Sequence, residues 1–459
     1  MNSTIFRERR TRLHRSIDGA IFLPGLHIAP RNYEKNGYPF RQDSHFLYFV
    51  GLSYPGLATL IRPDGTSCLY GTPQTDNDIV WEGKRPTLDA LAWAGGLDDV
   101  RTMDQLESDI RDLASTGETA HYLPPYRHDI LAWESALFQC SVKQIQSGFS
   151  TKLAEAVVQQ RIQKSDEEVA QIEKAIAVSK QMYDRAFAAV APGRFEYEIM
   201  GAMVGVAESN QASNAFLPIV TRHGEVLHNN RYDHMLKDGD LVLIDTGVEL
   251  PPYYYGSDIT RTVPANGRFS PRQQEVYDIV LDAQLRAIET ATPERSNKEV
   301  HLAAAHAIVN GLKAMNLMKG DTEEAVQAGA HTLLFPHGIG HMLGLDSHDM
   351  EDLGDFVAYP NGKKPAPAPG LQNLRLGRKL EPGFVVTVEP GIYFIPELID
   401  RWRADRKHEA FINFEEVNKF RTFGGIRIED DIVITDTGSR VLGPPIAKSA
   451  AEIQQQMAG

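Results

Sequence analysis

Two aspartates, Asp245 and Asp258, are the first candidates for chemistry in this sequence. They lie in LVLIDTGVELPPYYYGSDITRT, residues 241–262. If the chain turns at the Pro-Pro pair in this stretch, a hairpin places the two carboxylates directly opposite each other. Like charges opposed across two strands destabilise a sheet. An ion pair with Arg261 would account for either aspartate alone, whereas the facing pair predicts a bound metal cation.

A histidine-rich segment supplies further residues of the ligand type. PHGIGHMLGLDSHD, residues 336–349, contains His337, His341 and His348. A single histidine is more often a packed or capping residue. Three of them, interleaved with glycines that allow the backbone to approach a ligand closely, favour a site. We expect His341 to supply the metal-binding nitrogen.

Two more carboxylates lie in strand-like segments. Glu389 lies in VVTVEPGIYF, residues 385–394, and Glu429 lies in GGIRIEDDIVIT, residues 424–435. Strand alternation places Arg427 and Glu429 on one face. Each segment read alone has an ordinary explanation. Glu389 would then be an exposed strand residue, and Glu429 would form a surface ion pair with Arg427.

Together these residues predict a centre for two metal ions. The four acids Asp245, Asp258, Glu389 and Glu429 join one imidazole. Such an oxygen-rich set suits Mn, Co, Fe or Zn in a catalytic role better than a structural zinc. Four carboxylates do not fit one small ion, but they fit two ions that they bridge, roughly 3.5–4 Å apart. Two such ions activate water and polarise a carbonyl, which predicts hydrolysis of an amide or an ester.

The elements that position these residues mix strands with whole helices. Ser165 and Glu168 form a capping box in front of an amphipathic helix over residues 165–190. Polar or Pro-rich excursions are expected at residues 354–370 and 397–420. Strands and helices in this mixture predict an α+β domain. Helices are also expected at 275–291 and 298–316, and strands at 17–25, 46–52, 58–71, 119–125, 241–247, 258–264, 384–395 and 425–435.

The bulk properties of the chain limit its class. With 459 residues it is too long for one ordinary core, so two domains are expected, with a boundary near residue 160. The net charge of -14 argues against nucleic acid as the main partner. No stretch approaches the roughly 20 apolar residues of a membrane span. The two cysteines, Cys68 and Cys140, form no motif, so we expect a reduced cytoplasmic protein without a membrane partner.

Residues 165–440 resemble the pita-bread metallopeptidases, a family that includes methionine aminopeptidase, aminopeptidase P and prolidase. The resemblance is carried by LIDTG, DITRT, HGIGHMLGLDSHD, TVEPGIY and GIRIEDD, which are specific as a set. Family members hold two metal ions with two aspartates, one histidine and two glutamates in this chain order. The matching ligands are Asp245, Asp258, His341, Glu389 and Glu429.

The resemblance also implies roles for residues around the metals. Glu389 would act as general acid and base while it holds metal. His348 matches the histidine that contacts the scissile region, and His228 matches one near the substrate. His337 and Arg427 match further active-site residues, the arginine being beside the last glutamate ligand.

The first part of the chain extends the resemblance. YPFRQDSHFLYFVGL, residues 38–52, is similar to the first domain of aminopeptidase P and prolidase, which methionine aminopeptidase lacks. The resemblance therefore implies a smaller creatinase-like α/β domain over residues 1–160 and a pita-bread dimetal catalytic domain over residues 161–459. It also implies a homodimer.

The substrate follows from a third segment. GLQNLRLGRKLEPG, residues 370–383, resembles prolidase, in which the residue matching Arg375 binds the carboxylate of the substrate. A planar guanidinium suits a carboxylate. The resemblance thus predicts a manganese-dependent dipeptidase that hydrolyses Xaa-Pro dipeptides, with Co²⁺, Zn²⁺ or Fe²⁺ as alternative ions. One alternative is an Xaa-Pro aminopeptidase acting on longer peptides, because RQDSHFLYFVGL is equally similar to aminopeptidase P. The other is a non-catalytic binding module, although no ligand position is replaced.

Overall fold

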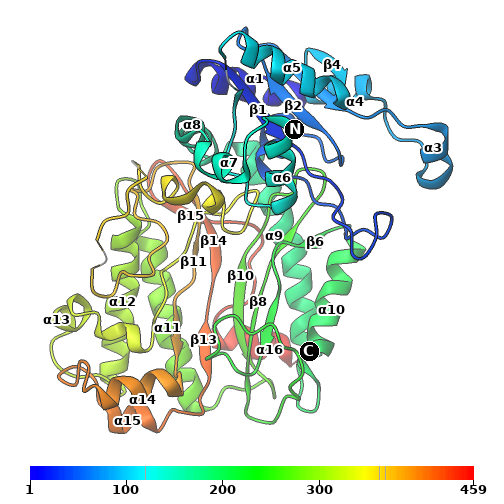
Figure 1. Ribbon diagram of the computed structural model, residues 1–459. Coiled ribbons are helices and arrows are strands. Elements are labelled where there is room, and N and C mark those ends of the chain that lie inside the picture. The colour runs from blue at the N-terminus through cyan, green and yellow to red at the C-terminus, as the bar shows by residue number, and fades with distance from the viewer. Residues whose placement is uncertain (119, 361, 367, 459) are drawn as a thin grey trace. The chain divides into compact units, whose positions relative to one another are not determined.

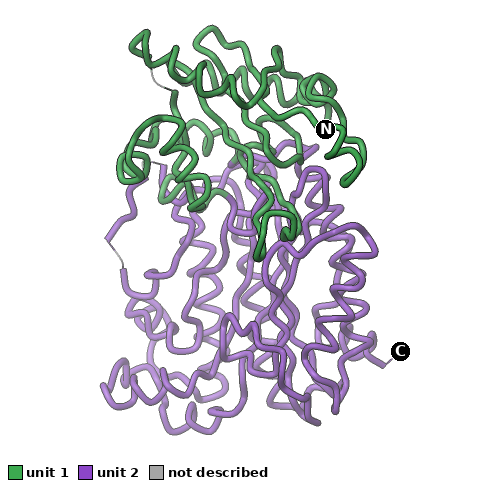
Figure 2. Tube along the Cα trace, turned by 45° about the vertical axis from the view of Figure 1, so that its right-hand side comes forward, with its two compact units in different colours: residues 1–161, 350–356 green, residues 162–349, 357–459 purple. Residues whose placement is uncertain are grey.

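Figure 2 shows the two units into which the chain divides. Unit 1 comprises Met1–Arg161 and Met350–Phe356, and unit 2 comprises Ile162–Asp349 and Val357–Gly459. The computed structural model describes residues 1–118, 120–360, 362–366 and 368–458. The expected strand at 119–125 and the expected excursion at 354–370 therefore fall partly outside the described residues. Among the described helices, none is long and apolar enough to cross a membrane.

Unit 1 is built on a five-stranded sheet of mixed direction. Its strands are ordered β4-β3-β2-β1-β5, and the outer pairs β3–β4 and β1–β5 are parallel. Apolar side chains from these strands form the core of unit 1. The strands are β1 (Ala20–Pro24), β2 (Ala58–Ile61), β3 (Ser67–Gly71), β4 (Asp99–Thr102) and β5 (Ala120–His121).

The helices of unit 1 surround that sheet (Figure 1). They are α1 (Ser3–Ser16), α2 (Ser44–Val50), α3 (Asp76–Glu82), α4 (Leu88–Gly95), α5 (Met103–Ser115), α6 (His128–Leu137), α7 (Val142–Gly148), α8 (Thr151–Arg161) and the short 3-10 helix η2 (Glu351–Phe356). The combination is an α/β unit, as expected for this part of the chain.

The predicted strand at residues 46–52 is wrong, because this segment belongs to helix α2. Every residue of α2 is buried, so no alternation of polar and apolar residues distinguishes the helix from a buried strand. The helix is marked only at its ends. Asp43 accepts a hydrogen bond from a first-turn amide, and Gly51 ends the helix in the left-handed region with φ 73°. Arg10 also donates to a carbonyl of the last turn, with a distance of 2.7 Å.

Unit 2 contains several short sheets that isolated bridges connect. One sheet is ordered β10-β8-β7 and another β11-β14-β15, while β12 pairs with β13 and β6 with β9. The bridge Thr260↔Glu429 joins the first sheet to the segment before β14. The strands are β6 (Ser213–Asn214), β7 (Ile219–Thr221), β8 (Leu241–Thr246), β9 (Val248–Glu249), β10 (Ile259–Pro264), β11 (Val385–Val388), β12 (Gly391–Tyr393), β13 (Gly425–Arg427), β14 (Asp430–Ile434) and β15 (Ser439–Val441).

Two pairs of helices flank these strands. Helices α9 and α10 lie on one side and α11 and α12 on the other (Figure 1). The capping box of Ser165 and Glu168 is confirmed at the start of α9. The helices of unit 2 are α9 (Asp166–Ala189), α10 (Glu196–Ser209), α11 (Pro271–Thr290), α12 (Asn297–Ala314), α13 (Thr322–Gln327), η1 (Ala330–Leu333), α14 (Pro396–Ala404), α15 (Phe414–Asn418) and α16 (Ala450–Met457). The predicted α+β class is confirmed.

The register of the β8–β10 hairpin differs from the prediction. Asp245 pairs with Thr260 rather than with Asp258, so the centre of the hairpin is shifted by one residue. Continuing this register places Gly247 opposite Asp258. A side chain at Gly247 would place its Cβ 1.7 Å from the carbonyl oxygen of Ser257, so only glycine fits there. The two aspartates are therefore diagonal neighbours on one face of the hairpin, which separates their charges but keeps them close.

Candidate metal centre and active site

Three of the predicted ligands converge in the middle of unit 2. Asp258 precedes β10, His341 lies in the loop whose bridge reaches β11, and Glu429 precedes β14. One ligand atom from each of the three lies within 4.8 Å of the other two. His341 Nε2 is 3.5 Å from Asp258 Oδ2. All three side chains are buried.

The two remaining predicted ligands adjoin this group. Glu389 directly follows β11, and its Oε1 lies 3.7 Å from His341 Nε2. Its backbone amide donates to Ile339 O, which fixes the chain beside the histidine loop. Asp245, near the end of β8, is buried, and its Oδ1 has no hydrogen-bond partner among the described residues.

Backbone contacts orient His341 as a metal ligand requires. Its Nδ1 lies 3.0 Å from the carbonyl oxygen of Met342, which can only accept a hydrogen bond. The proton is therefore on Nδ1, and the Nε2 lone pair faces the carboxylates. The amide of His341 donates to Thr387 Oγ1, which holds the residue against β11.

Asp258, Glu389 and Glu429 have raised pKa values because they are buried together. Burial raises the pKa of Asp258 well above its usual range, and the charges of Glu429 and Asp245 raise it further. Burial and the charge of Glu389 raise the pKa of Glu429 in the same direction. Burial raises the pKa of Glu389 to about 7, although Arg427 opposes the shift. Buried like charges must either take up protons or bind a cation.

The residues fit a pair of divalent ions. Among the described residues Asp245 Oδ1 lacks a hydrogen-bond partner, His341 Nε2 faces the carboxylates of Asp258 and Glu389, and the buried carboxyl groups repel one another. Oxygen and imidazole donors in this proportion suit first-row divalent metals. The site therefore has both the electrostatic need for cations and the donor atoms to hold them.

Arg427 orients two of the proposed ligands through hydrogen bonds, one direct and one through Thr260. Its Nη2 lies 2.5 Å from Asp245 Oδ2, and its Nε lies 3.2 Å from Thr260 Oγ1. Thr260 in turn donates to Glu429 Oε2 over 2.6 Å. The alternative of a surface ion pair between Arg427 and Glu429 is wrong, because the guanidinium is buried and pairs with Asp245.

Among the described residues Arg261 pairs with Asp430 and not with Asp245 or Asp258, the pairing that would have explained either ligand aspartate without a metal. Its Nη2 donates to Asp430 Oδ1 over 2.6 Å, and Lys448 Nζ lies 2.7 Å from the other oxygen of that carboxylate. The pKa of Asp430 is consequently lowered, mainly by Arg261 against the effect of burial. Arg261 therefore does not neutralise the ligand aspartates.

His337 is tied to Arg427 through a buried tyrosine. Its Nδ1 is 2.8 Å from the carbonyl oxygen of Gly338, so this nitrogen carries the proton. Tyr393 then donates its hydroxyl hydrogen to His337 Nε2 over 2.8 Å and accepts from Arg427 Nη1 over 2.9 Å. Burial lowers the pKa of His337 to about 3, and the charge of Arg427 contributes. The imidazole is therefore neutral, with Nδ1 3.8 Å from Glu389 Oε2.

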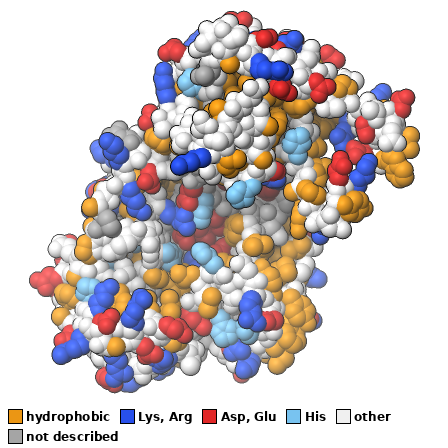
Figure 3. Space-filling model, viewed as in Figure 1, with side chains coloured by type: hydrophobic (Ala, Val, Ile, Leu, Met, Phe, Trp, Pro, Cys, Tyr) orange, Lys and Arg blue, Asp and Glu red, His pale blue; other side chains and the backbone are white. Residues whose placement is uncertain are grey.

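Three predicted substrate-binding residues are exposed around the buried centre. The ring of His348 has its centroid 4.3 Å from that of His341. Burial and the charge of Arg427 lower the pKa of His228, and Arg375 contributes. Arg375 also acts on the pKa of Glu389, which places its guanidinium near the centre. Acidic side chains gather in a hollow on this face of the molecule, with histidines around them (Figure 3).

The residues that hold the ligands in place were not predicted from the sequence. Thr260, Thr387 and Tyr393 all lie inside the quoted motifs, and each is hydrogen-bonded to a ligand or to Arg427. Asp431 accepts a hydrogen bond from the amide of Asp258 over 3.0 Å. The strand alternation that places Asp431 on the face of Glu429 was the one available signal.

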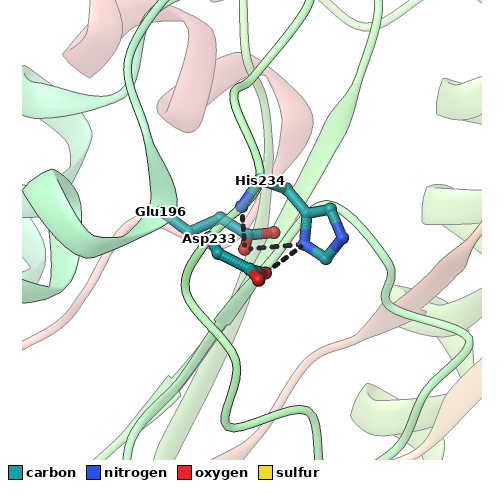
Figure 4. Close-up of side chains that lie close together, drawn as sticks. All are labelled: Glu196, Asp233 and His234. Atoms are coloured by element: carbon teal, nitrogen blue, oxygen red, sulfur yellow. Dashed lines mark hydrogen bonds and ion pairs between the residues drawn. The ribbon is translucent and has the colours of Figure 1, made fainter.

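A second group of possible ligand residues lies elsewhere in unit 2. Glu196, Asp233 and His234 converge near the start of α10 (Figure 4). The oxygens of Glu196 already accept hydrogen bonds from the amides of Arg222 and His234 and from His234 Nδ1. This carboxylate therefore fastens the loop between β7 and β8 to the start of α10, which is a structural role.

Comparisons with known proteins agree with this geometry. The model of metallopeptidase family M24 matches residues 170–436, and that of the aminopeptidase P N-terminal domain matches residues 6–122. An Xaa-Pro dipeptidase of Mus musculus is 32% identical over 96% of this chain and 89% of its own length. An Xaa-Pro aminopeptidase of Escherichia coli is 30% identical over 92% of this chain and 89% of its own length.

Solved structures extend the comparison. Aminopeptidase PepP of Pseudomonas aeruginosa is 29% identical, covers 100% of this chain and 98% of its own, and has a TM-score of 0.81. Zinc-substituted Escherichia coli aminopeptidase P with product is 28% identical at the same coverage and TM-score.

The fold and the carboxylate-rich centre define a metal-dependent peptidase with an aminopeptidase P-type N-terminal domain. The chain belongs to metallopeptidase family M24. The predicted pita-bread family, two-domain architecture and enzyme class are thereby confirmed.

Removal of metal should make stability depend on pH. The pKa of Glu389 in the folded chain, about 7, lies above its unfolded value, and those of Asp258 and Glu429 are raised likewise. The folded chain then holds more protons, so its stability falls as pH rises from the unfolded pKa values through the folded ones. After chelation, Tm should fall between about pH 5 and pH 8, and manganese should raise Tm more at the higher pH. An equal rise at both values would contradict the assignment.

Thr260→Val should weaken metal binding without unfolding unit 2. The substitution removes the hydroxyl that donates to Glu429 and accepts from Arg427. Loss of such an orienting contact typically costs roughly 10–100-fold in metal affinity or activity. Titration of the chelated protein with manganese measures the change. Thr59→Val is the matched control, since Thr59 is buried in unit 1 and its hydroxyl has no partner among the described residues.

Proposed function

We propose that this protein is a dinuclear-metal exopeptidase that hydrolyses the Xaa-Pro bond of dipeptides. The observation that carries the choice of dipeptide is the position of Arg375. Its side chain is exposed, and its charge acts on the pKa values of both Glu389 and His228. A guanidinium beside the reaction centre suits the free carboxylate of a C-terminal proline. The mouse relative named Xaa-Pro dipeptidase supports this proposal.

An Xaa-Pro aminopeptidase is the second candidate. The Escherichia coli relative of that name has nearly the same identity, and the similar solved structures quoted above are aminopeptidases. Such an enzyme leaves the far end of the peptide open, so it has no need of a carboxylate clamp. A non-catalytic module is disfavoured, because all five ligand positions keep donor side chains and the family is one of peptidases.

The proposed metal ligands are Asp245, Asp258, His341, Glu389 and Glu429. Two divalent ions, for which we propose manganese with Co²⁺, Zn²⁺ and Fe²⁺ as alternatives, supply a water-derived nucleophile at neutral pH and polarise the scissile carbonyl when bound. The Arg427–Thr260 contacts fix the acids on either side of the centre before substrate arrives.

The residues around the ligands divide the remaining tasks. Glu389 is less buried than the other acids, and its carboxylate takes the proton of the attacking water and delivers it to the proline nitrogen. His228 has a lowered pKa, caused by burial and Arg427, so it is neutral and can donate an N–H to the substrate. His348 contacts the scissile region, while the neutral His337 keeps its place through Tyr393.

A matched pair of substrates tests the proposed specificity. Arg375→Ala should raise KM for Ala-Pro by roughly 10–100-fold, the equivalent of one lost charged hydrogen bond. The value of kcat should change less, because the guanidinium binds the product-side carboxylate and not the reacting atoms. Arg286→Ala, on the exposed surface of α11, is the control. Efficient cleavage of Ala-Pro-Ala, together with unchanged kinetics on Ala-Pro, would support the aminopeptidase instead.

We also propose a homodimer. Helix α3 contains no buried residue, yet it carries Val80 and Trp81 with 79% and 75% of their surfaces exposed. Large exposed apolar side chains next to each other are typical of an interface. A second copy of the chain is the simplest partner, since most oligomers are symmetric assemblies of one chain.

Sedimentation measures this assembly. Replacing Val80 and Trp81 together by serine should convert a dimer to a monomer, because the substitutions remove apolar surface that association buries. Leu285→Ser, which alters an exposed apolar residue on α11, should leave the dimer intact. A wild-type chain that sediments as a monomer at micromolar concentration would exclude the proposal.

A further inference from the structure

Unit 1 contains a partly enclosed pocket that the proposed peptidase activity does not use. It lies beside the end of β1, the loop after β5, the start of α2, and α6. All residues that line it belong to unit 1. Its walls are mostly aliphatic, and they include Leu23, Leu26, Leu123, Pro124, Pro125 and Ile130.

Glu134 is the exceptional residue of this pocket. It lies on the buried face of α6 with Ile130 and Leu137, at positions where an apolar side chain is usual. Only 1% of Glu134 is exposed, and its Oε2 has no hydrogen-bond partner among the described residues. Burying a carboxyl group without a partner is costly, so the group calls for a functional explanation.

The cations that line the pocket already have partners. Arg127 makes two hydrogen bonds to Asp129, of 2.9 and 2.7 Å. His45 Nε2 lies 2.8 Å from Asp352 Oδ2, and its Nδ1 lies 2.7 Å from Arg161 Nη1. Both cations are close enough to Asp43 for its charge to raise their pKa values, whereas Glu134 Oε2 has no partner among the described residues.

Two neighbouring acids, Asp43 and Glu134, also line the pocket. Asp43 Oδ1 accepts from the amide of Phe46 over 2.8 Å, and its Oδ2 accepts from the hydroxyl of Tyr126 over 3.2 Å. Both donors are neutral. Burial, with a contribution from Asp43, raises the pKa of Glu134 to about 8. The pocket thus holds two neighbouring acids inside a largely apolar wall, and Glu134 keeps its proton near neutral pH until a cation takes the proton's place.

We propose that this pocket binds a primary alkylammonium group, with Glu134 and Asp43 around the charge and the aliphatic wall around the carbon chain. A divalent metal fits less well, because one of the three lining carboxyl groups, Asp352, is paired with His45, which leaves two in a mostly apolar wall. The ammonium donates hydrogen bonds to Glu134 Oε2, which supplies the missing partner.

Two sources carry this chemistry, a lysine side chain of a peptide and a free diamine. Both present a charged amine on a chain of methylene groups. The probes n-butylammonium, Nα-acetyl-lysine amide and 1,4-diaminobutane separate them. Binding of n-butylammonium reports recognition of the shared alkylammonium group. The relative affinities of Nα-acetyl-lysine amide and 1,4-diaminobutane show whether the pocket prefers a lysine side chain or a free diamine.

Ligand-observed NMR on protein loaded with diamagnetic zinc tests the proposal, since the metal is intended to occupy the acidic centre of unit 2 without broadening the ligand signals by itself. Line broadening of n-butylammonium should occur with the wild-type chain, and Glu134→Gln should weaken binding at least about 10-fold, the effect of removing one charged hydrogen bond. Asp43→Asn is the second variant, because asparagine still caps α2 but lacks the charge. Glu107→Gln, on the exposed surface of α5, is the matched control.

The outcomes are distinct. Weaker binding in both pocket variants, with wild-type binding in the control, supports the site. Absence of broadening with the wild-type chain, or equal broadening in all four proteins, overturns it. If Glu134→Gln does not fold, Asp43→Asn decides the question alone. Butanol, which has the same carbon chain without charge, should bind much more weakly, and equal binding of butanol would also overturn the proposal.

Discussion

Mutual repulsion among buried carboxyl groups is the constraint on which the rest of unit 2 depends. Asp258, Glu389 and Glu429 approach one another where little water can screen their charges, and their pKa values are raised as a result. An assembly of this kind is unfavourable by itself. It persists because strands and bridges far apart in sequence fix the backbone on which the acids stand. The electrostatic repulsion that destabilises these carboxyl groups without a cation is relieved when cations bind, so it favours cation binding.

The surrounding hydrogen bonds keep the acids from relieving that repulsion by moving apart. Arg427 pairs with Asp245 and reaches Glu429 only through the hydroxyl of Thr260. A single guanidinium therefore orients the acids without neutralising all of them. Tyr393 continues the same network to His337, so a shift of one partner would disturb both sides of the site. Because these side chains are already fixed in the folded protein, the entropy of ordering them is lost during folding and not when metal or substrate binds.

The residues with donor chemistry can be predicted from the sequence, because their types and motif positions are local properties. The same holds for α9, since a capping box and a helical period mark it within one segment. Helix α2 resembles a strand in the sequence because it is buried on all sides and its helical signals lie only at its ends. The register of β8 and β10 depends on the close approach at Gly247, which residue spacing does not reveal. The partner of Arg427 was missed for a related reason, since Asp245 lies 182 positions away in the chain.

The separation of Met350–Phe356 from the rest of unit 1 has a consequence for biosynthesis. The ribosome releases the first 161 residues long before it makes this segment, whose Asp352 contacts His45 over 2.8 Å. At about 5–20 residues per second, the delay is on the order of 10–40 s. During that interval the nascent N-terminal part lacks one of its own pieces, while most of the second half is still being translated. Completion of the first unit therefore waits for the chain that carries His348, and the two halves mature together rather than one after the other.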